Sequence, residues 1–197
     1  ARLVVARAFD ENGRGTYADV IESIDWIVAN KDVYGIRVLN LSISAPVQSH
    51  YWDDPLNQAV MVAWQAGIVV VTSAGNSGPE PMTIGVPGNV PYVITVGAMT
   101  DRYTSANAGD DALASFSSAG PTHEGFVKPE VVAPGGNVSG YMKGGSTIAV
   151  AHPEFVDQET TMGYTMSGTS QAAAATTGVV ALMLQVNPLL SPNDVKC

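Results

Sequence analysis

Two short polar segments, far apart in the chain, carry the residue types that could do chemistry. The first is Gly168-Thr169-Ser170, which leads into an alanine-rich apolar run, residues 174–185, that predicts a buried helix. A serine at a helix start meets free backbone N–H groups and the positive end of the helix dipole, which suits a nucleophile whose product is an oxyanion. Capping the helix is the commonest role of such a serine, so this segment alone leaves both roles open.

The second segment is the turn that follows residues 67–73, with the sequence GIVVVTS. This apolar, β-branched run predicts a buried parallel strand, and Ala74-Gly75-Asn76 predicts a tight turn at its end. Ligands of open α/β sheets bind outside the carboxyl ends of strands, which is where Asn76 belongs. Its amide can donate to a developing oxyanion, although an asparagine that only tolerates a left-handed turn conformation fits the same pattern.

The rest of the chain alternates strand and helix patterns. Strands are expected at residues 3–8, 36–43, 68–72 and 92–96. One helix is expected to begin at Thr16, and a second is expected to run from Pro55 to a stop at Gly67, with Asp54 as its N-cap. This order predicts a three-layer α/β/α fold with a mostly parallel sheet.

Three stretches depart from the alternation. Residues 100–111 are expected to form a polar loop, and residues 135–165 a long irregular insert with few periodic signals. Ser191-Pro192-Asn193-Asp194 has the N-cap serine, first-turn proline and acidic third position that open a helix. Because only three residues follow this segment, we expect that final helix to be incomplete.

Both polar segments, with several others in the same order, resemble the subtilisin-like serine proteases (subtilases). The matching stretches are VLNLS at 38–42, the strand and turn at 67–78, GVPG at 85–88 with 91–97, SFSSAGP at 115–121, and KPEVVAPG at 128–135. The resemblance implies a serine endopeptidase in which Ser170 attacks the peptide carbonyl. Asn76 and the Ser170 backbone N–H would then hold the oxyanion.

The resemblance also implies which residues contact the substrate. They come from the cleft edge, the strand end and its turn, and the approach to the nucleophile: Ser42, Ile43, Ser44, Ala45, Ser73, Ala74, Gly75, Gly85, Gly168 and Thr169. Ser44-Ala45 stands where the family often has Gly-Gly, so side chains there should narrow the subsites. Gln171 stands where the family usually has methionine, and it adds an amide beside the oxyanion site.

The family's Asp-Ser/Thr-Gly and His-Gly-Thr-His motifs, which supply the catalytic Asp and His, are not in this sequence. The histidines His50, His123 and His152 precede Tyr, Glu and Pro instead. We therefore expect residues 1–197 to be a partial subtilisin-like peptidase domain that lacks the N-terminal Asp/His part and the final helix. Alone, it is expected to be inactive or severely impaired.

A different class of function stays open. A non-catalytic peptide-binding domain would use residues 42–45 to pair with a substrate strand without cutting it. In either case, the expected partner is a peptide or protein substrate. An upstream His-Gly-Thr-His motif in the parent gene would separate the two interpretations.

Composition limits the other partners. A net charge of −9 argues against nucleic acid and anionic membranes, and no apolar run approaches the length of a membrane span. An open sheet edge predicts a possible homo-oligomer. No cofactor is required by the proposed chemistry, and the resemblance alone implies structural calcium, for which no ligands are assigned. Secretion is likewise implied only by the resemblance; the single Cys197 does not decide the compartment, so an intracellular location stays open.

Overall fold

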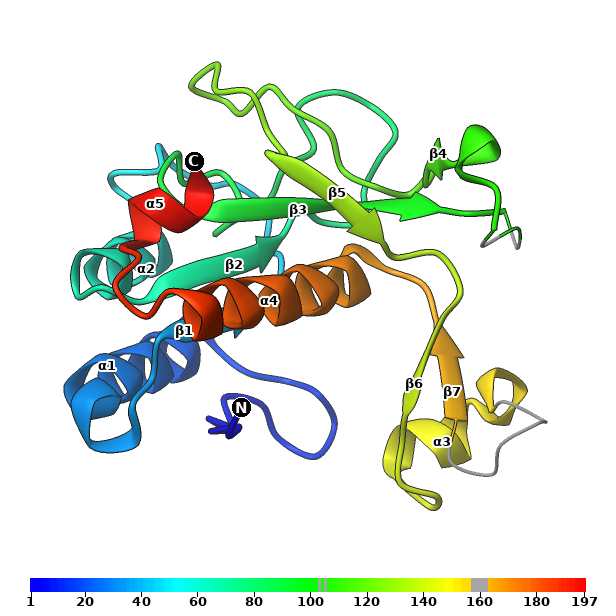
Figure 1. The fold of residues 1–197 in the computed structure, drawn as a ribbon, viewed down its shortest axis with the longest axis horizontal. Helices are drawn as coiled ribbons and strands as arrows, with labels where there is room; N and C mark the ends of the chain where they lie inside the picture. Colours follow the sequence, from blue (N-terminus) through cyan, green and yellow to red (C-terminus); the bar gives the residue numbers. More distant parts are fainter. Residues whose placement is uncertain (103, 105, 157–162) are drawn as a thin grey trace.

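The computed structural model describes residues 1–102, 104, 106–156 and 163–197 (Figure 1). Its α-helices are α1 (Tyr17–Tyr34), α2 (Pro55–Gln65), α3 (Thr147–Ala151), α4 (Thr169–Val186) and α5 (Pro192–Lys196). Its strands are β1 (Val38–Leu41), β2 (Val69–Ser73), β3 (Ile94–Thr100), β4 (Ala112–Leu113), β5 (Val131–Pro134), β6 (Val138–Tyr141) and β7 (Gly163–Met166). Short 3₁₀ turns lie at Ala108–Asp110 and Pro153–Phe155.

The main sheet is mostly parallel, as the sequence predicts. β1, β2, β3 and β5 lie side by side in that order and run parallel, while β4 pairs antiparallel with the end of β3. In this register Leu41 lies opposite Thr72, and Ser73 lies opposite Val96. The carboxyl ends of β1 and β2 therefore reach the same edge of the sheet, where the polar segments begin.

Helices cover both faces of this sheet. Every residue of β2 is buried, which requires cover on its two faces. The helix α2 contacts β2 and also packs on α1, whereas α4 crosses β1, β2, β3 and β5 (Figure 1). The predicted three-layer α/β/α arrangement is confirmed.

Side-chain caps fix where the helices begin, at the positions that the sequence indicates. Thr16 and Asp19 form a reciprocal capping box at α1. Asp54 is 2% exposed, and its carboxylate accepts hydrogen bonds from two backbone N–H groups at the start of α2. Ser191 and Asp194 form a second capping box at α5. These local hydrogen bonds satisfy N–H groups that a helix start leaves without partners.

The predicted strand at residues 3–8 is wrong. Residues 1–8 form no strand, and Leu3 and Val5 are 91% and 85% exposed. A strand exists only where its backbone finds a ladder partner, and β1 pairs only with β2 among the described strands. Residues 1–8 pair with none of the described strands and leave the other edge of β1 free, so their apolar pattern alone did not make them a strand.

The insert at residues 135–165 is more regular than predicted. β6 and β7 pair antiparallel, with Ser139 opposite Thr165, and α3 lies between them in the chain. Tyr164 is buried, and its hydroxyl donates to the carbonyls of Ile148 and His152. The two strands are distant in sequence, and such a non-local pairing leaves little trace in short-range periodicity.

The outer face of α4 is apolar. Val179, Leu182 and Val186 are 56%, 63% and 87% exposed, while Val180 and Leu184 of the same helix are buried in the core. The exposed side chains recur at helical spacing and therefore form one stripe. A stripe of this kind is typical of a surface that another chain or segment covers.

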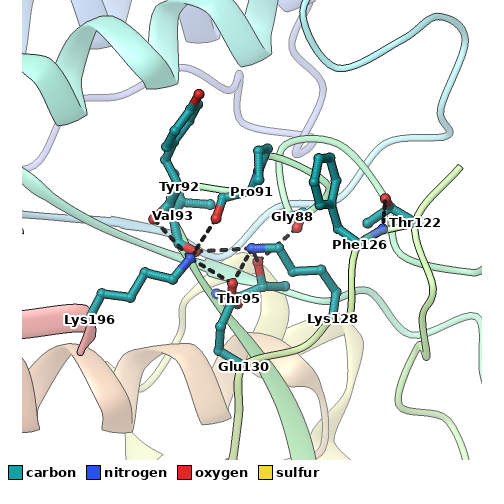
Figure 2. Close-up of polar contacts among 10 residues, drawn as sticks. All are labelled: Gly88, Pro91, Tyr92, Val93, Thr95, Thr122, Phe126, Lys128, Glu130 and Lys196. Carbon is teal, nitrogen blue, oxygen red and sulfur yellow. Dashed lines mark hydrogen bonds and ion pairs between the residues drawn. The ribbon is translucent and has the colours of Figure 1, made fainter. Parts of the chain in front are cut away.

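A network of two lysines and one carboxylate ties β3, β5 and α5 together, as Figure 2 shows. The Lys128 ammonium donates to the Val93 carbonyl at 3.0 Å, to Thr95 Oγ1 at 3.0 Å and to Glu130 Oε1 at 2.6 Å. Lys196 donates to the same carboxylate oxygen at 2.8 Å and to the carbonyls of residues 91–93. The short helix α5 is thereby fixed to the sheet.

Burial lowers the pKa of Lys128 to about 8, although the nearby Glu130 carboxylate opposes that shift. For Glu130, burial raises the pKa, but Lys128, Lys196 and the Thr95 backbone N–H outweigh it and hold the pKa below its usual value. The side chain of Lys128 is 1% exposed, so water screens it poorly.

Lys128 should make the stability of the chain depend on pH. Between about pH 8 and 10.5 the folded chain has lost this proton while the unfolded chain still binds it, so the contribution of Lys128 to stability rises with pH. We expect the free energy of unfolding of the chain, relative to a Lys128→Met variant, to increase by about 3 kcal/mol across this window. Urea denaturation at a series of pH values measures it. Lys31→Met, at a less buried lysine, is the control, and a flat or opposite trend for Lys128 would contradict this assignment.

Candidate active site

Ser170 is the second residue of α4, and it is tied to the end of β1. Its Oγ donates to the Ser42 carbonyl at 3.2 Å, and Ser42 Oγ donates to the Ser170 carbonyl at 3.0 Å. Among the described residues, nothing accepts the Ser170 backbone N–H. The site therefore offers a positioned hydroxyl beside an unused backbone donor.

Thr169 holds the amide of Asn76 in one orientation. Asn76 Oδ1 accepts from the Thr169 backbone N–H at 2.9 Å and from Thr169 Oγ1 at 3.0 Å. Thr169 is fully buried, and its Oγ1 accepts from the Gly75 backbone N–H at 3.2 Å. Because both donations go to Oδ1, the Nδ2 group of Asn76 keeps its hydrogens for another acceptor.

Ser170 and Asn76 line the same pocket, which has a volume of about 930 Å³. A Cβ built on Gly168 would lie 3.4 Å from Asn76 Nδ2, so this amide nitrogen lies next to the approach to the nucleophile. The two predicted catalytic residues thus line one pocket, although Asn76 follows the end of β2 and Ser170 lies at the start of α4. That the gap between the two donors fits one oxyanion oxygen stays a prediction.

Ser44 fills the space that two glycines leave open. A Cβ at Gly75 would lie 3.0 Å from Ser44 Oγ, and one at Gly85 would collide with the same hydroxyl. Gly75 also has a φ of 109°, which disfavours any other residue. The Ser44 side chain thus occupies part of the wall where the sequence predicts that it narrows the subsites.

The ten predicted substrate-binding residues divide into two groups. Six line the pocket: Ser44, Ala45, Ser73, Gly75, Gly85 and Thr169. The other four support its walls: Ser42 bonds to Ser170, Ile43 accepts from Ser73 Oγ, Ala74 is buried, and Gly168 donates to the Gly135 carbonyl. A direct contact between any of the ten and a substrate stays a prediction.

Two histidines that sequence reasoning did not assign to the site also line the pocket. His50 and His123 come from separate loops, with ring centroids 5.8 Å apart. No motif surrounds either residue, and the loops that carry them meet only in the folded chain. His152, by contrast, lies in the insert and pairs with Glu154 at 3.1 Å, as expected of a surface histidine.

In the described part of the chain, no histidine nitrogen lies within hydrogen-bonding distance of Ser170 Oγ, whose partner is the Ser42 carbonyl. The described residues also contain no group of three or more acidic, histidine or cysteine side chains placed to hold a metal ion. None of their helices is long and apolar enough to cross a membrane. Structural calcium stays an untested expectation.

The fold and the site define an α/β protein with a positioned serine at a helix start and an asparagine amide beside it. A family model described as the subtilase family matches residues 1–197. The serine protease AprX of Bacillus subtilis (strain 168) is 42% identical over all of this chain, which covers 45% of that protein. Subtilisin DY of Bacillus licheniformis is 33% identical over 98% of this chain, which covers 58% of that protein.

Solved structures agree with these relatives. Sphericase superimposes with a TM-score of 0.75 at 25% identity, covering 96% of this chain and 56% of that one. A cold adapted subtilisin-like serine proteinase superimposes with a TM-score of 0.70 at 29% identity, with the same coverage. The chain belongs to the subtilase family. It spans about half the length of the relatives it matches.

Thr169→Val should loosen the Asn76 turn, because valine keeps the shape but removes the hydroxyl. We expect the free energy of unfolding to fall by about 1–2 kcal/mol, since the Gly75 N–H loses its acceptor. The side-chain amide NMR signal of Asn76 should move as well. Thr176→Val is the matched control, because its hydroxyl bonds only to the Ala172 carbonyl of its own helix. Unchanged stability together with an unmoved Asn76 signal would contradict the role given to Thr169.

Proposed function

We propose that this chain supplies the nucleophile and oxyanion-binding part of a serine endopeptidase. The observation that carries the proposal is the pair of hydrogen bonds from Thr169 to Asn76 Oδ1, which leaves Nδ2 available beside Ser170. Membership of the subtilase family supports it, and so do relatives named as serine proteases. Asn76 Nδ2 and the Ser170 backbone N–H are the two proposed oxyanion donors.

In the proposed reaction, Ser170 Oγ forms a bond to the carbonyl carbon of the scissile peptide. The π electrons move onto the carbonyl oxygen, where Asn76 Nδ2 and the Ser170 N–H stabilise the negative charge. The tetrahedral intermediate then expels the amine, leaving an acyl group on Ser170, which water removes. The Ser170 proton needs a base before attack, and the same base returns it to the amine.

That base is missing from the described site. Ser170 Oγ donates to a backbone carbonyl, which is no proton acceptor near neutral pH. We therefore propose that these 197 residues, alone, are inactive or severely impaired. The active enzyme would need a histidine, oriented by an acid, brought to Ser170 from outside the described residues.

A non-catalytic peptide-binding role is the second candidate, and the absence of a described base near Ser170 favours it. The geometry also limits it, because the Ala45 backbone N–H and C=O already pair with Val86 at 2.9 and 2.8 Å. A substrate strand therefore cannot use these two groups of residues 42–45 for pairing. Both candidates share a peptide or protein as the ligand.

Labelling with a fluorophosphonate tests whether the Ser170 hydroxyl is activated by a base in this chain or keeps its proton. Without a base, the hydroxyl keeps its proton and reacts slowly; in subtilisin, loss of the triad histidine lowers kcat by about 10⁶. We expect barely detectable labelling of the chain over hours, measured by mass spectrometry, and no more than that of a Ser170→Ala control. Rapid, stoichiometric labelling of Ser170 would contradict this and show that one of the chain's own histidines serves as base.

Other features of the proposed function rest on the family resemblance. The chemistry requires no metal or organic cofactor, and structural calcium is proposed only as a stabilising ion. A negative net charge favours neither nucleic acid nor an anionic membrane as partner. The protein is proposed to be secreted, and an intracellular location is the alternative.

We also propose that the chain forms a homo-oligomer through the edge of β1 and the apolar stripe of α4. β1 has one partner strand among those described, and the stripe at Val179, Leu182 and Val186 is exposed. Unpaired strand edges and contiguous apolar surfaces both favour association. The exposed Leu3 lies in the segment that precedes these elements and is expected to be covered as well.

Light scattering tests this association. We expect a mass of at least twice that of the 20.5 kDa chain, and a shift toward monomer for Leu182→Glu. Val62→Glu, at an exposed apolar residue of α2 away from the stripe, should leave the mass unchanged. A strict monomer with ordered, exposed residues 3–5 would contradict the proposal.

A further inference from the structure

The pocket beside Ser170 has an unusual set of ionisable side chains. Of the 18 residues that line it, His50 and His123 alone can carry a charge; the others are small, polar or apolar. The chain as a whole is strongly acidic, with a net charge of −9, yet none of these 18 described lining residues has a carboxylate. The charge of its lining therefore depends on two imidazoles.

The segment from Ser42 to His50 connects the nucleophile with these imidazoles. Ser42 accepts from Ser170 Oγ at one end, Ala45 pairs with Val86 midway, and His50 lies at the other end. Val47 and Met82 add apolar surface to the same pocket. A side chain that enters beside Ser170 thus meets apolar surface as well as imidazole nitrogens.

The surroundings of His50 fix its ring. The ring stacks on Trp52 with centroids 4.5 Å apart and planes 10° apart. Glu124 Oε1 lies 3.5 Å from His50 Nδ1 and accepts from the Tyr51 backbone N–H at 3.0 Å. The Glu124 side chain is 6% exposed, so its carboxylate is buried beside the His50 ring. Nε2 is the nitrogen of His50 on the opposite side from this carboxylate.

His123 has no such carboxylate. Among the described residues, no acidic oxygen lies within ion-pair distance of its ring, whose aromatic neighbour is His50. Glu124 offsets a positive charge on His50, whereas nothing described offsets one on His123. A proton on His123 therefore gives the pocket a net positive charge.

We propose that this pocket selects a substrate side chain with an aliphatic stem that ends in a carboxylate, namely glutamate, held by His50 and His123. This assignment rests on the proposed function and adds the substrate class to it. Protonated imidazoles donate charge-assisted hydrogen bonds to a carboxylate, and apolar surface such as that of Val47 and Met82 accommodates the methylene stem. Neutral glutamine has the same shape without the charge.

The selectivity should depend on pH, because histidine side chains change charge in the range between about pH 5 and 8. The groups that face the two rings are the Glu124 carboxylate, beside His50, and each ring itself. Tyr51 and Trp52 pack alongside and carry no charge there. Acidic conditions therefore favour a glutamate ligand, and mildly alkaline conditions remove the preference.

Binding of peptide amides to the 197-residue chain tests the assignment without requiring turnover. The probes are acetyl-Ala-Ala-X-amide peptides with X as Glu, Gln, Lys or Phe, with dissociation constants from calorimetry at pH 5.5 and pH 8. We expect the Glu peptide to bind about tenfold more tightly than the Gln peptide at pH 5.5, with a ratio near one at pH 8.

His123→Gln should abolish this preference. His152→Gln is the control, since His152 is also an exposed histidine but lies outside the pocket. Retention of the preference in His123→Gln, tightest binding by the Phe or Lys peptide, or equal binding of all four peptides would overturn the assignment and leave the proposed function standing. Binding of none would contradict the peptide cleft itself and the assignment with it.

Discussion

The candidate site depends on one constraint, the pair of hydrogen bonds by which Thr169 holds Asn76 Oδ1. These residues lie 93 positions apart in sequence, one after the end of β2 and one at the start of α4. The bonds join the sheet to the helix and also orient the Asn76 amide. Because Thr169 is fully buried and fits between Gly75 and Asn76, the same contact determines packing and chemistry.

The parallel sheet makes that contact possible. β1 and β2 end at the same edge, so Ser42 and Asn76 both reach the start of α4, and Ser42 and Ser170 exchange two hydrogen bonds there. α4 brings its unused N–H groups to this edge because its apolar inner face packs across the strands. Burial of apolar surface thus positions the polar groups that a peptide carbonyl would meet.

Local patterns predicted the sheet and the caps at Thr16, Asp54 and Ser191, because periodicity and capping are short-range, whereas the joint role of Ser170 and Asn76 was implied by the family resemblance. Local patterns failed where an element depends on a second segment that is distant in the sequence. The strand predicted at residues 3–8 finds none in the described chain, whereas β6 and β7 find each other across the insert. His50 and His123 were missed for the same reason, since separate loops bring them to one pocket.

The most direct test follows the Asn76 side-chain amide and the Ser170 backbone amide by ¹H–¹⁵N NMR. The chain is titrated with a peptide that ends in a free carboxylate, which mimics the cleaved product and offers one oxygen to both donors. We expect the two signals to shift together and to saturate with the same dissociation constant, and we expect the C-terminal amide of the same peptide to shift them less. An Asn76 side-chain signal that stays in place while the Ser170 signal moves would contradict a shared oxyanion site.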